Sequence, residues 1–368
     1  MENVFGFRSF ASARIGARGL GARAVVGRAG LQPFQPAPEP WPRSAVPSFE
    51  HDVLVGLGRA QKAIPSTWLY DHRGSELFEQ ITHVDEYYPT RNELRILQSC
   101  RREIADAAGP RAIVIELGSG SSRKTRLLLD ALDTPQAYLP IDISEQFLRE
   151  AVANLPSLYA GLRVLPIAAD FTRIESLPEL TVLRAGGDPG RCVVFFPGST
   201  IGNFTPEGAV ALLRRVRRLA GPDALLIVGA DSTQDPAVLI PAYDDREGVT
   251  AEFNLNLLAR INRELMADFN LDAFSHEARF DAQHRRVEMH LVSRCAQRVS
   301  VLGRRFHFRA GESIHTENSY KYSLLGFQQL ATRAGWVHAQ RWIDAQSRFA
   351  VHVLEPIAGV RDQQMMFG

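Results

Sequence analysis

Two neighbouring stretches of the chain decide the fold class: Ala112-Ile-Val-Ile-Glu-Leu-Gly118-Ser-Gly120-Ser-Ser-Arg-Lys124-Thr125, and then Tyr138-Leu-Pro-Ile-Asp142. The first is typical of a buried strand, a glycine turn and the start of a helix, and the second of another strand that ends in an acid. Strand, turn, helix and strand in this order form the frame of a nucleoside-cofactor site in an α/β protein.

The glycine turn lacks the third glycine of a dinucleotide fingerprint. Counting G-x-G-x-x-G from Gly118, the last glycine position is occupied by Arg123. A pyrophosphate-binding turn uses that glycine for close packing of helix on strand, whereas an adenosyl cofactor without phosphates does not need it. The pattern Glu116-x-Gly118-x-Gly120 with Asp142 therefore favours S-adenosylmethionine (SAM) over NAD, and a dehydrogenase is a distant alternative.

The residues around this turn are predicted to hold the cofactor. Gly118 and Gly120 allow the backbone to pass close to a ligand. The helix that starts near Ser121 offers free N–H groups, and Lys124 adds a cation in its first turn, which suits the carboxylate of the methionine part of SAM. Asp142, at the end of the second strand, is placed to bind two ribose hydroxyls.

The ends of the next two strands carry further candidates. Asp170 and Phe171 follow the third strand. The Asp170 carboxylate can accept a hydrogen bond from the exocyclic amine of adenine, and the Phe171 ring can pack on the base. The fourth strand leads into Gly198-Ser-Thr-Ile-Gly-Asn203, at the place where class I methyltransferases present the methyl group. Its glycines leave room for a substrate, and the side-chain amide of Asn203 can both donate and accept hydrogen bonds. Such turns also use Gly and Asp for geometry alone, but their recurrence at consecutive strand ends favours a cofactor site.

From residue 111 onward, short apolar strands alternate with helices, as in a doubly wound parallel sheet. Strands are expected at 112–117, 137–142, 162–168, 191–197 and 223–230, and helices at 122–133, 144–154 and 205–220. Before this region we expect a helix at 48–60 and another from Thr90, as its cap, to about 107, with Glu93 in the capping-box position. Pro89 is expected to hold Tyr88 outside that second helix.

After Asp231 the alternation ends. A helix is expected over 235–270, followed by antiparallel strands near 277–280, 286–293 and 305–309; a helix at 323–334 and a hairpin of 336–343 with 347–354 then return to the first sheet. The fold class is therefore α/β: a Rossmann-like class I SAM methyltransferase core, 92–232 and 322–357, with an inserted α+β substrate-binding domain, 48–91 and 233–321. Residues 1–47 are rich in Arg and Pro and poor in acids; we interpret them as a disordered or non-native extension, with a transit peptide as the alternative.

The composition excludes several classes of function. The 368 residues are 45% hydrophobic and 23% charged with a net charge of +1, so no strong field attracts nucleic acid or an anionic membrane. The apolar runs are shorter than the roughly 18 residues that span a bilayer. Cys100, Cys192 and Cys295 form no C-x-x-C pair, and the histidines are scattered, so no metal site is expected and a reducing cytoplasm is the simplest location. A monomer is compatible with the sequence, which does not fix the oligomeric state.

Between residues 50 and 355 the chain closely resembles the L-histidine Nα-methyltransferases of ergothioneine biosynthesis. The motifs that carry the resemblance are Trp68-Leu-Tyr-Asp-x-x-Gly-Ser-Glu-Leu-Phe-Glu-Gln-Ile-Thr82, Glu86-Tyr-Tyr-Pro-Thr-Arg91, Glu116-Leu-Gly-Ser-Gly-Ser-Ser-x-Lys-Thr125, Gly198-Ser-Thr-Ile-Gly-Asn203, Ala242-Tyr-Asp-Asp245 and Thr316-Glu-Asn-Ser319. The resemblance implies SAM-dependent trimethylation of the α-amine of free L-histidine to hercynine, with three SAM consumed per product.

The resemblance also implies roles for individual residues. Asn203 and Tyr243 would hold the substrate carboxylate, and Glu317 and Ser319 the imidazole, with Met289 beside it. A pocket built around such polar contacts rejects analogues that cannot make them.

The remaining implied contacts lie near the amine. Tyr87 would line the pocket, Tyr70 would lie near the amine, and the backbone of Gly198 would contact it. Tyr70 and Asn203 are the candidate catalytic residues. Tyr70 or a water could take the proton, and the sequence does not identify a general base. Asn318 and the segment Tyr320-Lys-Tyr322 depart from the family pattern and put the amino-acid selectivity in doubt. A methyltransferase of the same fold acting on another amino acid or small amine, and a SAM-binding protein without catalysis, are the alternatives.

Overall fold

The computed structural model describes residues 48–120, 122–185 and 190–358. The predicted extension 1–47 lies outside these residues, as does Ser121. Among the helices of the described ranges, none combines the length and apolar character needed to cross a membrane.

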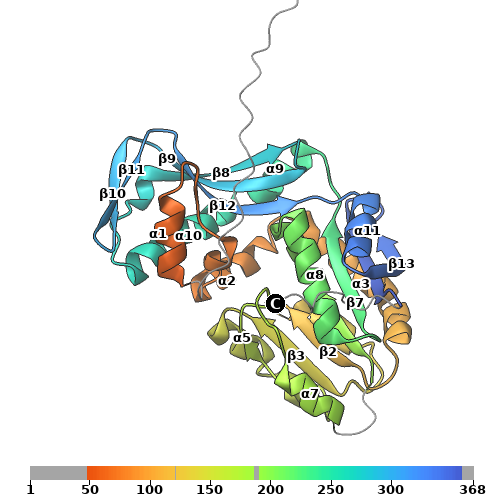
Figure 1. The fold of residues 1–368 in the computed structure, drawn as a ribbon. Coiled ribbons are helices and arrows are strands. Elements are labelled where there is room, and N and C mark those ends of the chain that lie inside the picture. The colour runs from red at the N-terminus through yellow and green to blue at the C-terminus, as the bar shows by residue number, and fades with distance from the viewer. Residues whose placement is uncertain (1–47, 121, 186–189, 359–368) are drawn as a thin grey trace, which may run out of the picture. The chain divides into compact units, whose positions relative to one another are not determined.

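The larger sheet has eight strands and contains the strands of both stretches that decide the fold class. Its order is β13-β14-β7-β6-β2-β3-β4, with β5 also paired to β3. Its parallel strands are β2 (Ile113–Leu117), β3 (Ala137–Asp142), β4 (Arg163–Val164), β5 (Ile167–Ala168), β6 (Cys192–Phe196) and β7 (Leu225–Asp231). The antiparallel hairpin of β13 (Trp336–Ile343) and β14 (Phe349–Pro356) joins at β7. The predicted Rossmann-like core is therefore confirmed (Figure 1).

Helices cover both faces of this sheet, so that its central strands are buried throughout. One face packs against α3 (Tyr88–Ala108), α4 (Arg123–Leu129), α5 (Glu145–Val152) and α6 (Leu155–Leu158). The other packs against α7 (Pro178–Ala185), α8 (Pro206–Ala220) and α11 (Leu324–Arg333). Helices connect β2 to β3, β3 to β4, β5 to β6 and β6 to β7, and the carboxyl ends of these parallel strands form one edge.

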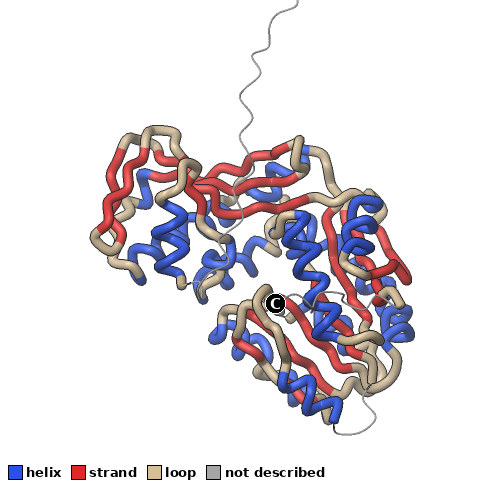
Figure 2. The backbone as a smooth tube through the Cα atoms, viewed as in Figure 1, coloured by secondary structure: helices blue, strands red, loops and turns tan. Residues whose placement is uncertain are grey.

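A second sheet of four strands has the order β1-β12-β9-β8. It consists of β1 (Lys62–Ala63), β8 (Phe274–Asp281), β9 (Arg286–Ser293) and β12 (Ser313–Tyr320), and a separate pair is formed by β10 (Gln297–Val301) and β11 (Arg304–Phe308). Its core is shared with α1 (Phe49–Leu57), α2 (His72–Ile81), α9 (Pro236–Tyr243) and α10 (Val249–Glu264). Short 3-10 turns lie at Ser66–Leu69, Thr200–Asn203 and Leu271–Ala273. Figure 2 shows the strands of the two sheets in red.

Several predicted elements are wrong in detail. The strand expected at 162–168 is split into β4 and β5, because Pro166 between them cannot donate to the sheet. The helix expected over 235–270 is two helices, α9 and α10, separated at Gly248, whose φ of 77° suits a glycine. Strands β10 and β12 and helix α7 were not expected.

The predicted capping box at Thr90 is also wrong. Helix α3 begins at Tyr88, and the side chain of its N-cap residue, Tyr87, makes no capping hydrogen bond. Pro89 lies in the first turn of the helix, where the missing N–H of proline costs no helical hydrogen bond. Glu93 lies inside the helix and is fully buried. Its carboxylate pairs with Lys124 and accepts hydrogen bonds from the backbone of Gly198.

Candidate active site

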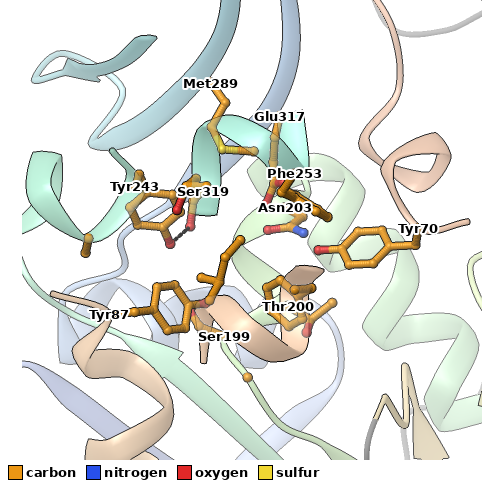
Figure 3. Close-up of a pocket in the computed structure, with 15 residues that line it drawn as sticks. Tyr70, Tyr87, Ser199, Thr200, Asn203, Tyr243, Phe253, Met289, Glu317 and Ser319 are labelled. Carbon is orange, nitrogen blue, oxygen red and sulfur yellow. Dashed lines mark hydrogen bonds between the residues drawn. The ribbon is translucent and has the colours of Figure 1, made fainter. Parts of the chain in front are cut away.

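A pocket of about 470 Å³, including the part open to solvent, contains every residue that was predicted to contact the substrate. These residues are Tyr70, Tyr87, Gly198, Asn203, Tyr243, Met289, Glu317 and Ser319. Figure 3 shows most of them pointing into one cavity. Sequence reasoning did not single out Phe78, Ile81, Ser199, Thr200, Ala242, Thr250 and Phe253, which complete the lining.

The lining comes from elements that are far apart in the sequence. Tyr70 follows the 3-10 turn Ser66–Leu69, and Tyr87 immediately precedes α3. Gly198 and Asn203 belong to the loop after β6, and Gly198 has a φ of 81°. That loop packs tightly on the second sheet, since a Cβ on Gly202 would lie 2.7 Å from the carbonyl oxygen of Tyr320. The polar substrate side of the pocket is thus held against the strand ends of the core.

A β-bulge in β12 directs Glu317 toward the pocket. The register between β12 and β9 shifts between His315 and Glu317, so that Glu317 lies opposite Met289. The hydroxyl of Thr316 donates to the carbonyl of Met289 at 3.0 Å, and His315 Nε2 donates to the carbonyl of Glu317 at 2.9 Å. Bulges commonly re-aim side chains at active sites, and here Glu317 and Ser319 come to share the face that carries Met289.

Burial raises the pKa of Glu317 to about 7. The positive charge of Lys321 and a hydrogen bond from Asn203 oppose this rise. Burial and the nearby Glu317 carboxyl raise the pKa of Tyr70 well above its usual range. The Tyr70 hydroxyl is therefore protonated at neutral pH, so it can orient an amine but holds no phenolate that could accept its proton.

A buried polar group behind the pocket was not predicted. Lys321 and Asp231 are fully buried and form an ion pair of 2.8 Å. The ammonium of Lys321 also donates to the hydroxyls of Tyr243 and Ser319, and Tyr88 donates to Asp231. In the sequence, the only signal was the position of Asp231 at the end of a parallel strand and of a lysine two residues after Ser319.

The predicted cofactor residues lie at the carboxyl ends of neighbouring strands. Gly118 and Gly120 both have positive φ values, 70° and 50°. The Asp142 carboxylate accepts from the backbone N–H of Gly120 at 3.2 Å and of Ser144 at 3.0 Å, which links the ends of β2 and β3. Apart from Gly120 and its two chain neighbours, no described residue has an atom within 4 Å of where a Cβ on Gly120 would be, so this backbone is open to a ligand. These features fit an adenosyl cofactor.

The predicted adenine residues follow β5. Phe171 lies 3.6 Å from the position of a Cβ on Gly118, and its ring contacts the rings of Phe196 and Phe204. Asp170 accepts from the backbone and the hydroxyl of Thr172 through one oxygen. The aromatic surface beside the glycine turn is therefore held in place by the core and by its own loop.

Lys124 is engaged in a way that the sequence did not indicate. Its ammonium forms an ion pair of 2.6 Å with Glu93, and both oxygens of Glu93 accept from the backbone N–H of Gly198, at 3.0 and 2.8 Å. Because Lys124 comes from the cofactor turn and Gly198 from the substrate loop, Glu93 connects the two halves of the site. Glu116 is buried as well, where it accepts hydrogen bonds from Thr125 and Tyr138.

Three potential metal ligands, Glu288, His290 and His315, lie within 4.8 Å of one another on the second sheet. Their atoms are already engaged: Glu288 pairs with Arg286 and with His290, and His290 also contacts Ser313. We interpret this cluster as a hydrogen-bonded support of the β12 bulge.

A doubly wound sheet with an open glycine turn, an acid at the next strand end and an adjoining polar pocket defines the class of SAM-dependent methyltransferases. The family model described as "Histidine-specific methyltransferase, SAM-dependent" matches residues 49–356, and the chain belongs to this family. The predicted preference for SAM over NAD is thereby confirmed.

Several curated relatives are similar over most of the chain. Histidine N-alpha-methyltransferase of Mycolicibacterium smegmatis is 40% identical over 314 residues, which cover 84% of this chain and 95% of that protein. The protein of the same name from Mycobacterium tuberculosis is 40% identical over 309 residues, covering 83% and 94%. Ergothioneine biosynthesis protein 1 of Neurospora crassa is 30% identical over 299 residues, covering 80% of this chain and 33% of that longer protein.

Proposed function

We propose that this methyltransferase trimethylates the α-amine of free L-histidine to hercynine, a step of ergothioneine biosynthesis. The observation that carries the proposal is that Asn203, Tyr243, Glu317 and Ser319 meet in one pocket. An amide and a hydroxyl suit the α-carboxylate, and a buried carboxyl and a hydroxyl suit the two ring nitrogens of an imidazole. Met289, opposite Glu317, supplies an apolar contact for the ring.

The cofactor side is proposed from the strand ends. Gly118 and Gly120 would contact the methionine part of SAM, Asp142 the ribose hydroxyls, and Asp170 and Phe171 the adenine. Lys124 would contribute to the same carboxylate while it remains paired with Glu93. When bound, SAM would supply a sulfonium methyl group, whose carbon the amine attacks in line as the bond to sulfur breaks and S-adenosylhomocysteine leaves, so positioning of the amine provides much of the rate.

The substrate amine must be neutral when it attacks. The α-amino group of a peptide has a pKa of about 8, and the adjacent carboxylate of a free amino acid raises this pKa, so only a small neutral fraction exists near pH 7. The Tyr70 hydroxyl and the Gly198 backbone would then orient the lone pair, and Asn203 would hold the carboxylate beside them. The proton leaves with solvent in this account, because the high pKa of Tyr70 keeps its hydroxyl protonated.

We propose that residues 48–91 and 233–321 form the substrate-binding part and residues 92–232 and 322–357 the cofactor-binding part. The shared sheet of β1, β8, β9 and β12 supports this division. Helix α3, which begins at Tyr88, crosses the proposed boundary. We also propose a reducing cytoplasm as the location, because Cys100, Cys192 and Cys295 are free thiols.

A panel of free amino acids and amines with methyl-labelled SAM tests the proposal. We expect histidine to have the highest kcat/KM by a wide margin, since it alone among the common amino acids offers two ring nitrogens and a carboxylate at the required spacing. A higher kcat/KM for another amino acid would replace histidine as the substrate. Binding of SAM without transfer to any member of the panel would instead support a SAM-binding protein without catalysis.

A further inference from the structure

We infer that Lys321, paired with Asp231, is a positioning residue that sets the hydrogen-bond directions of Tyr243 and Ser319 and so makes the pocket selective for substrates that carry an α-carboxylate. The inference rests on the proposed function, because it assigns a partner to the same pocket. Lys321 itself does not line the pocket, whereas the two hydroxyls that it contacts do.

The three N–H groups of the Lys321 ammonium have three partners. Nζ lies 2.8 Å from Asp231 Oδ2, 2.7 Å from the Tyr243 hydroxyl and 2.9 Å from Ser319 Oγ. An ammonium only donates, so each hydroxyl oxygen must accept from it. The lysine thereby occupies one acceptor position on each hydroxyl oxygen.

The two hydroxyls also contact each other, at 2.7 Å. One of the two hydroxyl protons must therefore lie between the two oxygens. The other hydroxyl proton is free to point toward a ligand. If Ser319 donates to Tyr243, both acceptor positions of the tyrosine oxygen are filled, and its own proton points to the ligand. Tyr243 is then a donor, as a carboxylate requires, and Ser319 keeps one acceptor lone pair that faces the ligand.

Asp231 makes this arrangement possible in a buried setting. Its Oδ2 accepts from Tyr88 at 2.6 Å, and its Oδ1 accepts from the backbone N–H of Thr233 at 2.9 Å. The carboxylate is thus fully bonded and neutralises Lys321, so that the pair orients the hydroxyls without leaving an unpaired charge. Removal of only one partner would leave such a charge and is expected to be destabilising.

The test therefore uses the double variant Lys321→Met/Asp231→Asn beside Lys321→Met alone. The KM and kcat are measured by steady-state kinetics with SAM, for histidine and for histamine, which lacks the carboxylate. The Kd of each amine is measured by calorimetry with S-adenosylhomocysteine in place of SAM. The matched control is Lys62→Met, which removes a lysine paired with Glu312 next to the other end of β12. Thermal melting and S-adenosylhomocysteine affinity report whether each variant is folded with an intact cofactor side.

We expect the double variant to melt as a folded protein and to bind S-adenosylhomocysteine normally. Its KM and Kd for histidine should rise roughly 10- to 100-fold, the loss of one charge-assisted hydrogen bond, with a smaller change in kcat. The affinity for histamine should change little, so the preference for histidine over histamine should shrink, while Lys62→Met keeps the wild-type preference.

A folded double variant with the wild-type KM and the wild-type preference for histidine would overturn the inference. Equal losses for histidine and histamine would also overturn it, because they would indicate a general structural role. Failure of the proposed function is a separate outcome, since it is judged on the wild-type protein alone. In that case the same comparison is made with the best amino acid of the panel and its decarboxylated amine.

Discussion

Glu317 is the residue on which recognition of an imidazole depends most. It is buried, its pKa is raised to about 7, and it receives a hydrogen bond from Asn203. Near neutral pH its carboxyl is therefore divided between the charged and neutral forms, and an N–H donor in the pocket would favour the charged form. The carboxyl would thus discriminate between substrates that offer such a donor and those that do not.

The first prediction concerns Glu317→Gln, which keeps the size of the side chain and removes its negative charge. We expect kcat/KM for histidine to fall roughly 10- to 100-fold, because a charge-assisted hydrogen bond to the ring is lost. SAM affinity should not change. Glu312→Gln, directly before β12, is the matched control and should keep the wild-type kcat/KM; an unchanged value for Glu317→Gln would contradict the pocket assignment.

The second prediction follows from the same pKa. In the folded protein Glu317 holds its proton up to about pH 7, whereas in the unfolded chain it releases the proton at about pH 4.3. Protonated Glu317 therefore contributes most to stability at low pH, and this contribution declines as the pH rises to 7. The difference in unfolding free energy between wild type and Glu317→Gln should fall by on the order of 3 kcal/mol over that range.

Denaturant unfolding of both proteins without ligands, at several pH values, measures this difference. Subtracting the variant removes the contributions of groups that the two proteins share, including Glu116, whose pKa burial also raises. A difference that does not depend on pH would show that the Glu317 carboxyl is not held in a desolvated environment.

At the scale of elements, the strand β12 and the loop after β6 determine the pocket. The motif Thr316-Glu-Asn-Ser319 was recognised in the sequence, but the strand that carries it was not. Its sequence, Ser-Ile-His-Thr-Glu-Asn-Ser-Tyr, lacks alternation of apolar and polar residues, because nearly all of its side chains are buried and most are polar. Periodicity reports which side faces solvent, so it is uninformative for a strand whose polar groups are bonded inside the protein.

The third prediction tests the bulge in β12. Thr316→Val preserves the shape of the side chain but removes its hydrogen bond to the Met289 carbonyl. We expect a loss of about 1 kcal/mol in stability and a higher KM for histidine, because Glu317 loses its fixed direction. Thr332→Val removes a similar bond to the Gln328 carbonyl on the exposed surface of α11 and should alter neither quantity appreciably.

The fourth prediction concerns the connection between the two loops. Glu93→Gln weakens the bonds to the Gly198 backbone and removes the charge that pairs with Lys124. We expect KM to rise for SAM and for histidine together, whereas Glu317→Gln affects histidine alone. A rise in only one of the two KM values would show that Glu93 does not couple the cofactor turn to the substrate loop.

At the scale of the whole molecule, the sheet was more predictable than the site. The parallel strands were located from short apolar runs and from the glycines and acids at their ends, because local pattern and burial agree in a doubly wound sheet. The pocket residues were assembled from motifs, since Tyr70, Tyr243 and Glu317 lie far apart in the chain. Lys321 and Glu93 were missed as site residues, because partners such as Asp231 and Gly198 are brought to them only by the tertiary fold.

The fold also accounts for why one chain contains both halves of the site. The substrate loop after β6 contacts the cofactor turn through Glu93 and the second sheet through the close approach of Gly202 to Tyr320. A methyl donor at the strand ends would therefore face the α-amine of a substrate whose ring is held by β12 and whose carboxylate is held at the end of α9. Methylation of that amine, and of no other atom of the substrate, is the central claim.

The most direct test is to incubate the purified protein with SAM and L-histidine and to identify the product by mass spectrometry and NMR. We expect products with one, two and finally three added methyl groups, all on the α-nitrogen, with the imidazole unchanged. A product methylated on the ring, or no transfer to histidine under conditions in which the protein binds SAM, would contradict the account.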